Sequence, residues 1–320
     1  MRIGIVLDPL ERLDPSGDSS LALIEAAQAL GHESFVAETR ELTLVDGRTC
    51  APLRRIHLAG GHMQGPRWVA PDPWCTLEPA GGLTALETLD ALLFRTDPPV
   101  DARYLWATYL LDRVDPRRTV MVNDPRGIRA ANEKLFALRF PELMPPTIVT
   151  ADGGLIRSFV DTHGTAVAKP IDGFAGRGVL RLQADDPNVA SIVEVMTARG
   201  AQPIVAQAWV AAASGGNKRI LVYDGDAVGA VNRPVEPRDF RTGNPGAATD
   251  LGARDLEIVA RLAPSLRELG LRLVGLDVIG DSLIEVNVTS PGGIRQALGL
   301  GLAELARTVI QRIEADCQRR

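Results

Sequence analysis

The sequence predicts an α/β protein in two parts: a doubly wound N-terminal α/β lobe, followed by a part of α+β character. Three observations support this prediction. Strand-like and helix-like patterns alternate up to about residue 128, as they do in doubly wound sheets. Beyond that point, strand-like runs follow one another at hairpin spacing. A strongly amphipathic helix pattern at residues 253–269 then interrupts this second series.

The N-terminal elements are defined by short apolar runs and by the residues that end them. The expected strands are 2–8, 34–38, 91–95 and 119–124, and the expected helices are 19–30 and 102–114. Asp18 or Ser19 is a suitable N-cap for the first helix, and Gly31 stops it. Asp46-Gly47 predicts a tight hairpin turn. The Gly-, Pro- and Trp-rich segment 60–82 is expected to be loop.

The C-terminal elements begin with a short helix expected at 131–140, just before Pro141. The expected strands are 164–170, 178–183, 203–210 and 218–225, with a further strand pair within 274–288. One face of the 253–269 helix should be buried through Leu256, Val259, Leu262, Leu266 and Leu269. A final helix runs to the C-terminus. We therefore expect three lobes, with limits 1–128, 129–210 and 211–320.

Composition narrows the class of protein. The net charge of −5 over 320 residues argues against nucleic acid as a partner, because nucleic acid favours a basic surface. The three cysteines lie far apart without CxxC spacing, which predicts neither a zinc site nor a disulfide framework and suits a reducing cytoplasm. The sequence has no signal-peptide pattern and no apolar run of about 18 residues. We therefore expect a soluble cytoplasmic protein without a membrane partner.

The stretch VGLDVIGDSLIEVNVTSPGG (274–293) reads as two apolar strands that carry Asp277, Glu285 and Asn287. A three-residue turn, Gly280-Asp281-Ser282, would place the first of these opposite the second, whereas a two-residue turn would put Asp277 on the wrong face. Strand alternation would then turn Ile284 toward the core. Three oxygen-bearing side chains on one face could hold Mg²⁺ or Mn²⁺. The alternative is a solvated sheet face with incidental acids.

Two further features concern phosphate. Lys169 lies within an apolar strand, where it is either an edge residue with its ammonium group in water or a phosphate ligand. The glycine-rich turn DGFAGRG (172–178) follows, and its backbone N–H groups could face an anion. It matches neither GxxxxGK[ST] nor GxGxxG. Together with the acidic strand pair, these features favour a nucleoside triphosphate site.

Several motifs, spread over nearly the whole chain, are similar to those of one family. They are RIGIVLDP (2–9), RTDPP (95–99), ATYLLDR (107–113), VNDP (122–125), NEKLFALRF (132–140), KPIDGFAGRG (169–178), KRILVYDG (218–225) and VGLDVIGDSLIEVNVTSP (274–291). In these motifs the chain resembles the ATP-grasp superfamily and, within it, the prokaryotic glutathione synthetase family. The resemblance implies an ATP-grasp fold preceded by an N-terminal α/β domain.

The resemblance also implies site residues. ATP would be bound by Lys134, Lys169, Gly173, Gly176, Arg177, Gly178, Gln207, Ala208, Trp209, Val210 and Asn217. Two Mg²⁺ or Mn²⁺ ions would be held by Asp277, Glu285 and Asn287, with Glu285 bridging them. The catalytic arginines would be Arg219, Arg233 and Arg241. The substrates would contact Ser19, Arg95, Asp97, Ser290, Pro291, Gly292 and Gly293.

The activity that the resemblance implies is ATP-dependent joining of γ-glutamylcysteine to glycine through an acyl phosphate. The implied partners are a small dipeptide, an amino acid and further copies of the chain, as a dimer or tetramer. Two alternatives stay open: a related ligase for another dipeptide or specialised metabolite, and a non-catalytic ATP-binding protein. The presence of the whole set of metal and phosphate residues argues against the second alternative.

Three places depart from the family's pattern. Thr96 stands where lysine is frequent, and the Pro/Gly-rich stretch 233–248, a candidate lid, is short. Gly292-Gly293 follows Pro291, which resembles the D-alanine–D-alanine ligases at this point. All three lie where the substrates should bind. They therefore bear on the identity of the substrates rather than on fold or reaction type.

Overall fold

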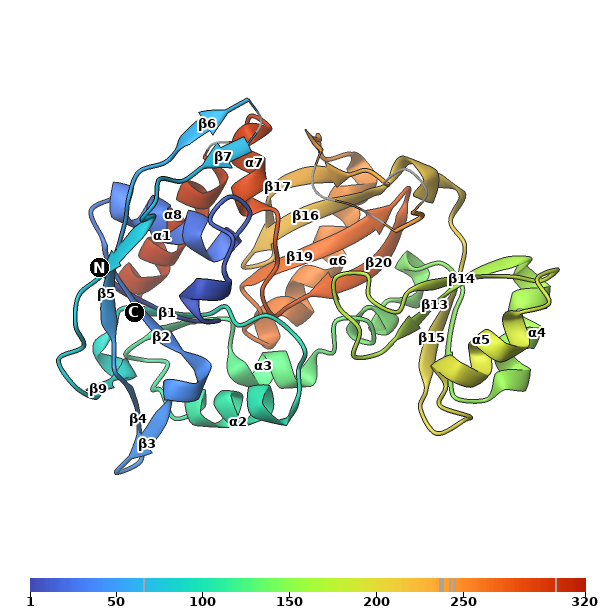
Figure 1. Cartoon of the computed structure of the whole chain (residues 1–320), viewed down its shortest axis with the longest axis horizontal. Coiled ribbons are helices and arrows are strands. Elements are labelled where there is room, and N and C mark those ends of the chain that lie inside the picture. The colour runs from blue at the N-terminus through green and yellow to red at the C-terminus, as the bar shows by residue number, and fades with distance from the viewer. Residues whose placement is uncertain (66, 236–238, 242, 244–245, 303) are drawn as a thin grey trace.

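The computed structural model describes residues 1–65, 67–235, 239–241, 243, 246–302 and 304–320. Its three largest sheets define the architecture (Figure 1). The six-stranded N-terminal sheet lies at the left of that view, a five-stranded sheet in the centre and a four-stranded sheet at the right. No helix in the described part of the chain combines the length and the apolar character needed to cross a membrane.

The N-terminal sheet has helices on both faces, which confirms the doubly wound prediction. Its strands in spatial order are β11 (Val120–Val122), β10 (Ala91–Phe94), β1 (Arg2–Leu7), β2 (Glu33–Glu38), β5 (Arg54–Leu58) and β8 (Cys75–Leu77). The first four are parallel. One face packs on α1 (Ser19–Ala29) and α8 (Leu305–Gln318). The other packs on α2 (Ala102–Leu111) and α3 (Pro125–Ala130).

Two small sheets accompany this lobe. The hairpin of β3 (Thr43–Val45) and β4 (Arg48–Ala51) turns at Asp46-Gly47, as predicted, and β4 pairs with β9 (Thr84–Ala85). The prediction that 60–82 is loop was wrong, because β6 (His62–Gln64), β7 (Arg67–Val69) and β8 lie within it. These strands are short and mostly exposed. They therefore lack the apolar alternation that would have revealed them.

The helix expected at 131–140 was also wrong. Instead, α3 starts earlier, where the Asp124 carboxylate accepts a hydrogen bond from the Arg126 amide at 2.8 Å and Pro125 occupies the first turn. A turn follows in which the Asn132 side-chain oxygen accepts from the amides of Lys134 and Leu135, both at 3.1 Å. Only Phe136–Arg139 forms a short 3₁₀ helix. Lys134 therefore lies on a connecting segment rather than on a helix.

The four-stranded sheet has the order β12-β15-β13-β14, all antiparallel. Its strands are β12 (Thr147–Thr150), β15 (Ile204–Ala208), β13 (Thr165–Pro170) and β14 (Leu180–Gln183). One face packs on α4 (Gly153–His163) and α5 (Val189–Met196). Sequence analysis assigned no element to either helix or to β12. The opposite face carries polar and apolar groups that line a cavity.

The five-stranded sheet has the order β18-β17-β16-β19-β20 and is antiparallel throughout. Its strands are β18 (Ala247–Ala248), β17 (Asp226–Arg233), β16 (Asn217–Tyr223), β19 (Leu273–Ile279) and β20 (Ser282–Asn287). The helix α6 (Ala253–Glu268) covers its apolar face. Val259, Leu262 and Leu266 of α6 are buried as predicted, and Leu269 packs at the edge of the core. Leu256 is half exposed, which corrects its assignment to the buried face.

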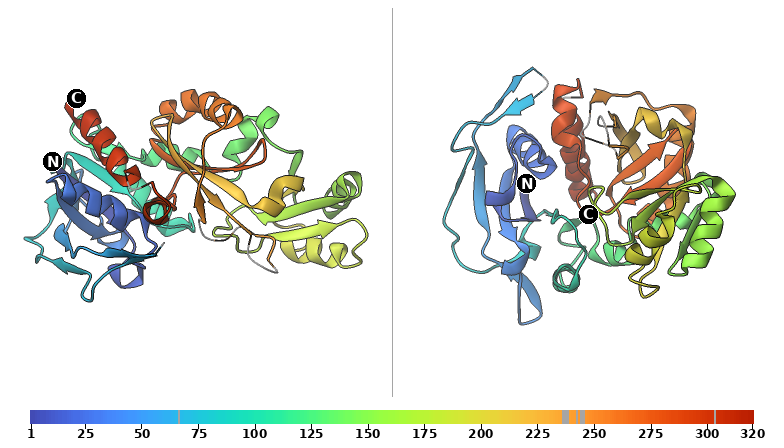
Figure 2. Two further views of the ribbon diagram at one scale, coloured as in Figure 1. Left: turned by 90° about the horizontal axis from the view of Figure 1, so that it is seen from above. Right: turned by 45° about the vertical axis from the view of Figure 1, so that its right-hand side comes forward.

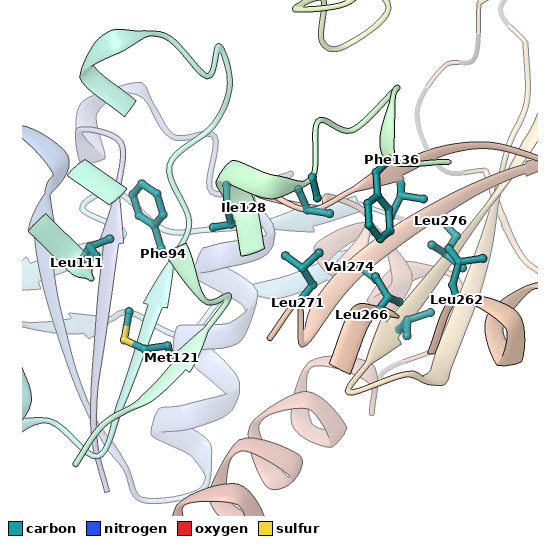
Figure 3. Close-up of a cluster of buried hydrophobic side chains, with 14 of the residues drawn as sticks. Phe94, Leu111, Met121, Ile128, Phe136, Leu262, Leu266, Leu271, Val274 and Leu276 are labelled. Carbon is teal, nitrogen blue, oxygen red and sulfur yellow. The ribbon is translucent and has the colours of Figure 1, made fainter. Parts of the chain in front are cut away.

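The end of the chain returns to the N-terminal lobe. After α7 (Ile294–Gly299), the last helix α8 packs against α1, and Figure 2 shows it alongside the N-terminal sheet. The lobe limits 1–128, 129–210 and 211–320 stay a prediction. A continuous apolar cluster also joins the N-terminal lobe to the five-stranded sheet (Figure 3). In that view it runs from Phe94 and Met121 through Ile128 to Leu271 and Leu276.

Gly127 is required where α3 meets the end of α6. A Cβ atom at this position would lie 2.0 Å from the Leu269 carbonyl oxygen. We expect Gly127→Ala to lower the free energy of unfolding by about 1–3 kcal/mol, the usual cost of forcing atoms into a packed interface. Urea denaturation measures this change. Gly60→Ala is the control, because a Cβ atom there meets nothing within 4 Å; an equal effect at both positions would contradict the packing argument.

Candidate active site

A cavity of about 350 Å³ lies between the four-stranded and five-stranded sheets. Its polar lining includes five cationic side chains: Lys134, Lys169, Arg219, Arg233 and, from the 233–248 segment, Arg241. The oxygen donors expected to hold metal, Asp277, Glu285 and Asn287, lie on the five-stranded sheet, which also contributes Asn217 to the lining. Each sheet therefore has one face on a helical layer and the other on this cavity. The architecture thus brings together residues that are more than 150 positions apart.

The polar face of the five-stranded sheet results from strand register. Arg219 of β16 pairs with Asp277 of β19, which in turn pairs with Glu285 of β20. Directly opposed residues in an antiparallel sheet share a face. Asn217 and Arg233 also oppose each other, on β16 and β17. Alternate residues of these strands, among them Ile220, Leu276 and Val286, are apolar and pack with residues of α6 in one buried cluster.

The turn between β19 and β20 corrects one expectation. The turn has two residues, Gly280-Asp281, because Ile279 pairs with Ser282. A β-bulge nevertheless brings Glu285 opposite Asp277, since the register shifts by one residue between Asp277 and Val278. As a consequence Ile284 lines the cavity instead of the core, while Leu283 is fully buried. The predicted pairing was right, but a bulge rather than a three-residue turn produces it.

Asp277 and Arg219 form a buried ion pair. Arg219 Nε donates to Asp277 Oδ1 at 2.5 Å and Nη2 donates to Oδ2 at 2.8 Å, and Arg233 Nη1 lies 3.7 Å from Oδ2. Burial alone would raise the pKa of the Asp277 carboxyl group, but the Arg219 guanidinium holds this pKa below its ordinary value. Burial likewise works against the Arg219 charge, and Asp277 raises the pKa of Arg219 above its ordinary value. Both groups are therefore ionised at neutral pH.

Glu285 contacts a lysine that also reaches the glycine-rich turn. Lys134 Nζ is 3.3 Å from Glu285 Oε1 and also donates to the carbonyl oxygen of Gly173 in the glycine-rich turn. Asn287 Nδ2 donates to the Gly275 carbonyl oxygen at 3.0 Å, and Asn287 is part of the cavity lining. Acid, amide and lysine thus meet at the point where the two sheets approach each other.

Lys169 projects from β13 into the cavity and donates to Gln207 Oε1 at 2.9 Å. Burial lowers the pKa of the Lys169 ammonium group, and the nearby Glu285 carboxylate opposes that shift. Val167, two residues earlier on β13, also lines the cavity. Trp209 and Val210 follow β15 and line the same end. These three side chains make this part of the lining apolar, and Asn217 also lines the cavity.

The glycine-rich turn and part of the expected lid meet above the cavity. Gly176 and Gly178 have positive φ values of 71°, which favour glycine. Arg241 Nη1 donates to the Gly176 carbonyl oxygen at 3.2 Å, and the Phe240 ring lies 6.1 Å from the Trp209 ring. Arg241 is also bound by Asp239. The lid stretch 233–248 was predicted as a whole, and residues 236–238, 242, 244 and 245 lie outside the described residues.

The expected substrate residues lie at two depths. Asp97 and Ser290 line the cavity. Burial raises the pKa of the Asp97 carboxyl group, although the Arg95 guanidinium opposes this shift. Arg95 itself is buried and donates to the Ser20 hydroxyl oxygen at 3.2 Å and to the Pro291 carbonyl oxygen at 3.1 Å.

The remaining expected substrate residues are not part of the cavity lining. Ser19 Oγ accepts a hydrogen bond from the Ile294 amide at 3.1 Å, so it holds the start of α7. Gly292 and Gly293 lie in the same connection between β20 and α7. A role for this connection in acceptor binding stays a prediction. The structure links it firmly to the N-terminal lobe through Ser19 and Arg95.

Sequence analysis missed several residues of the lining. The most polar are Glu133 and Thr289, and the others include Val167, Phe174, Phe240 and Ile279. The period-2 pattern of β13 could have indicated Val167, which is two positions from Lys169. Glu133 could not be found in this way, because it lies in a connecting segment next to Lys134.

The donor set fits a hard cation and a nucleoside triphosphate. Two carboxylates and one amide oxygen on adjacent strands are oxygen ligands of the kind that Mg²⁺ prefers. Two lysines and two arginines face them, so triphosphate charge can be matched from several sides. Asp277 contacts Arg219 here, and Glu285 contacts Lys134. A bound metal ion would compete with these two cations for the carboxylate oxygens.

Solved structures share this fold. D-cycloserine synthetase DcsG aligns with a TM-score of 0.64 at 18% identity, over 98% of this chain and 100% of that one. The ATP-grasp ligase PsnB, in complex with precursor peptide PsnA2 and AMPPNP, aligns with a TM-score of 0.63 at 19% identity, over 99% and 98%. The sheet pair with its polar cavity, together with the match of residues 133–300 to a family model of an ATP-grasp domain, defines an ATP-grasp protein.

Sequence comparison defines the family. Residues 1–129 match the model of the prokaryotic glutathione synthetase N-terminal domain, and residues 133–300 match that of its ATP-grasp domain. The chain belongs to the prokaryotic glutathione synthetase family and is an ATP-grasp ligase that forms an amide bond. Relatives named glutathione synthetase are 46% identical in Nostoc sp., over 99% of each chain, and 43% identical in Synechocystis sp., over 97% of this chain and 98% of that one.

Proposed function

We propose that this chain joins γ-glutamylcysteine to glycine at the expense of ATP, and that two Mg²⁺ ions serve the reaction. The observation that carries the proposal is the meeting of Lys134, Lys169 and Arg219 with Asp277 and Glu285 in one cavity of a chain that aligns with a family member over 99% of its length. Such a set matches a triphosphate and its cations, and it has no evident use in a protein that binds neither.

The metal ions would be held by Asp277, Glu285 and Asn287. Bound there, Mg²⁺ would neutralise phosphate charge and make the γ-phosphorus more electrophilic. Lys134 and Lys169 would hold the phosphates from the opposite side, as their positions next to Glu285 and Gln207 suggest. Val167, Trp209 and Val210 offer the apolar end to the adenine base.

The reaction asks the protein mainly to position charge. The cysteinyl carboxylate oxygen of the dipeptide bonds to the γ-phosphorus while the bond from phosphorus to the β–γ bridging oxygen breaks, releasing ADP. The neutral amine of glycine then bonds to the acyl carbon, the bond from that carbon to the phosphate oxygen breaks, and the surplus amine proton passes to water. Arg219 and Arg233, which both line the cavity, would stabilise the negative charge of both steps.

Water must be kept from the acyl phosphate. The contact of Arg241 with Gly176 and that of Phe240 with Trp209 support a covering role for this part of the 233–248 segment. The cover brings a cation and an aromatic ring over the phosphate and adenine ends. In this proposal Arg241 acts from the cover, and Arg177 and Gly173 act from the turn beneath it.

The departure at Thr96 gives little support to a different dipeptide. The Thr96 hydroxyl hydrogen-bonds with the Thr39 hydroxyl at 2.6 Å, and Thr96 is not part of the cavity lining. A substitution at this position therefore need not change the substrate. The Gly292-Gly293 connection is the place where an altered acceptor would be recognised.

We further propose a cytoplasmic location, because the free thiols of Cys50, Cys75 and Cys317 suit a reducing compartment. We also propose that the chain forms a homo-oligomer, either a dimer or a tetramer.

The test is Mg²⁺-dependent ADP release by the purified protein. We expect release only when γ-glutamylcysteine and glycine are both present, with glutathione detected by mass. Omitting either substrate, or replacing glycine by alanine, supplies the controls. ATP binding without ADP release from this pair would refute the substrate assignment while leaving the ATP-grasp chemistry intact, and a panel of other dipeptides and amino acids would then be assayed.

A further inference from the structure

Glu133 binds the residues that directly follow β20 through one carboxylate oxygen. Its Oε1 accepts hydrogen bonds from the Val288 amide at 2.9 Å, the Thr289 amide at 3.1 Å and the Thr289 hydroxyl at 2.8 Å. Three donors on one oxygen are enough to satisfy its acceptor capacity. The residues that donate directly follow Asn287. The carboxylate of Glu133 thus fixes the backbone of the two residues after Asn287, the last expected metal ligand.

The backbone of Glu133 holds the same strand one step earlier. Its carbonyl oxygen accepts from the Val286 amide at 3.0 Å. Val286 lies between Glu285 and Asn287, so residues bound to Glu133 flank Asn287 on both sides and Glu285 on one side. The next residue is Lys134, whose ammonium group contacts Glu285. The segment of Glu133 and Lys134 therefore contacts β20 in two ways: Lys134 contacts the Glu285 side chain, and Glu133 binds the backbone on both sides of Asn287.

We propose that Glu133 is a positioning residue, which fixes residues 286–289 so that Glu285 and Asn287 face the cavity in the geometry that metal-bound ATP requires. The inference rests on the proposed function for the identity of the metal ligands. It assigns to Glu133 neither contact with the substrates nor proton transfer. Outer partners that orient metal ligands typically matter by about 10–100-fold in metal affinity or activity.

Acceptor geometry, rather than charge, is what this role needs. A glutamine at position 133 retains an amide oxygen that can accept from Val288 and Thr289, whereas a leucine retains none. Burial and the charge of Glu285 both raise the pKa of the Glu133 carboxyl group, and the bonds from Thr289 oppose that shift. A role as general base for the acceptor amine would require the ionised carboxylate. Glutamine can therefore replace Glu133 in the positioning role but not as a general base.

The experiment compares Glu133→Gln and Glu133→Leu in the full chain. Two readouts need no peptide substrate: hydrogen–deuterium exchange of the 286–291 segment, and Mn²⁺ affinity measured by electron paramagnetic resonance with a non-hydrolysable ATP analogue. We expect Glu133→Leu to speed exchange in this segment and to weaken Mn²⁺ binding about 10–100-fold, and Glu133→Gln to lie at least about 10-fold closer to wild type in Mn²⁺ affinity. Glu268→Leu and Glu268→Gln, at an exposed glutamate near the end of α6, are the controls.

Turnover adds the test against a catalytic role. If Glu133→Gln loses as much kcat as Glu133→Leu while Mn²⁺ affinity and exchange are unchanged, Glu133 acts through its charge and the proposal is overturned. Wild-type exchange and affinity in Glu133→Leu would also overturn it. Should the leucine variant fail to fold, Thr289→Val removes only one donor and should shift exchange and affinity in the same direction by a smaller factor. Both binding readouts are independent of γ-glutamylcysteine and glycine, so they stand even if wild type does not ligate that pair.

Discussion

Glu285→Gln is expected to reduce Mg²⁺-dependent ADP formation to below about 1% of wild type while the protein stays folded. The substitution keeps the shape of the side chain but removes the charge that faces Lys134 at 3.3 Å and that the metal ions would need. The loss of one preorganised electrostatic group typically costs at least about 100-fold in kcat. ADP release is measured with saturating substrates, and circular dichroism and thermal unfolding report on the fold.

The matched control lies in the same hairpin. Asp281→Asn also replaces a carboxylate by an amide, but Asp281 is exposed at the turn and is not part of the cavity lining. We expect this variant to keep its turnover. If Glu285→Gln turned over like wild type, the assignment of the metal strand would be wrong.

Removing either member of the Arg219–Asp277 pair should destabilise the fold as well as the reaction. Each side chain is over 90% buried and each is the main partner of the other. Truncating one member leaves an uncompensated charge in the interior, which costs about 3–5 kcal/mol. We therefore expect Arg219→Leu and Asp277→Leu each to lower the free energy of unfolding by this amount. The double variant should lose less than the sum of the two, and urea denaturation of all four proteins measures the coupling.

Arg219→Lys serves as the control for charge alone. It keeps a cation at position 219 but cannot form the paired bonds that the planar guanidinium makes with both oxygens of Asp277. We expect Arg219→Lys to unfold at a free energy between those of Arg219→Leu and wild type, and its kcat to stay close to that of Arg219→Leu. Additive losses in the double variant would mean that the pair does not act as a unit.

The same pair implies a direction for pH dependence. The pKa of Asp277 is lower in the folded protein than its ordinary value, so its ionised form is favoured by folding. This contribution to stability is complete above the unfolded-state pKa of about 3.9 and is lost as the pH falls through the folded-state value. In Arg219→Leu the buried carboxyl group loses its partner and can relieve its burial by taking up a proton. The stability difference between wild type and Arg219→Leu should therefore narrow as the pH is lowered from about 7 to about 4, and a difference that widened would contradict this assignment.

Ion pairs join two cations of the cavity to two of the expected metal ligands. Arg219 forms an ion pair with Asp277, and Lys134 forms one with Glu285. Each of these two cations thus offsets the charge of the carboxylate that it contacts. Binding of ATP with its metal ions would exchange these partners, the phosphates taking the lysine and arginine charges while the metal takes the carboxylates. The double role of each residue is the reason that its substitution affects both stability and turnover.

What the sequence determined by itself was local pattern and motif. Period-2 alternation marked the strands around Asp277 and Glu285, the Asp46-Gly47 pair marked a hairpin, and the motifs from 132 to 178 marked the family. These signals depend on neighbours along the chain. They could therefore be read without knowing how the sheets pack.

Tertiary structure decided everything that depends on partners far along the chain. A β-bulge compensated for the short turn and brought Glu285 opposite Asp277, and Ile284 moved into the cavity as a result. Glu133 became the anchor of residues 288 and 289, more than 150 positions away. Long-range hydrogen bonds, strand register and buried charges are properties of two segments together. No periodicity within either segment records them, which is why this clamp and the Arg219–Asp277 pair emerged only from the folded molecule.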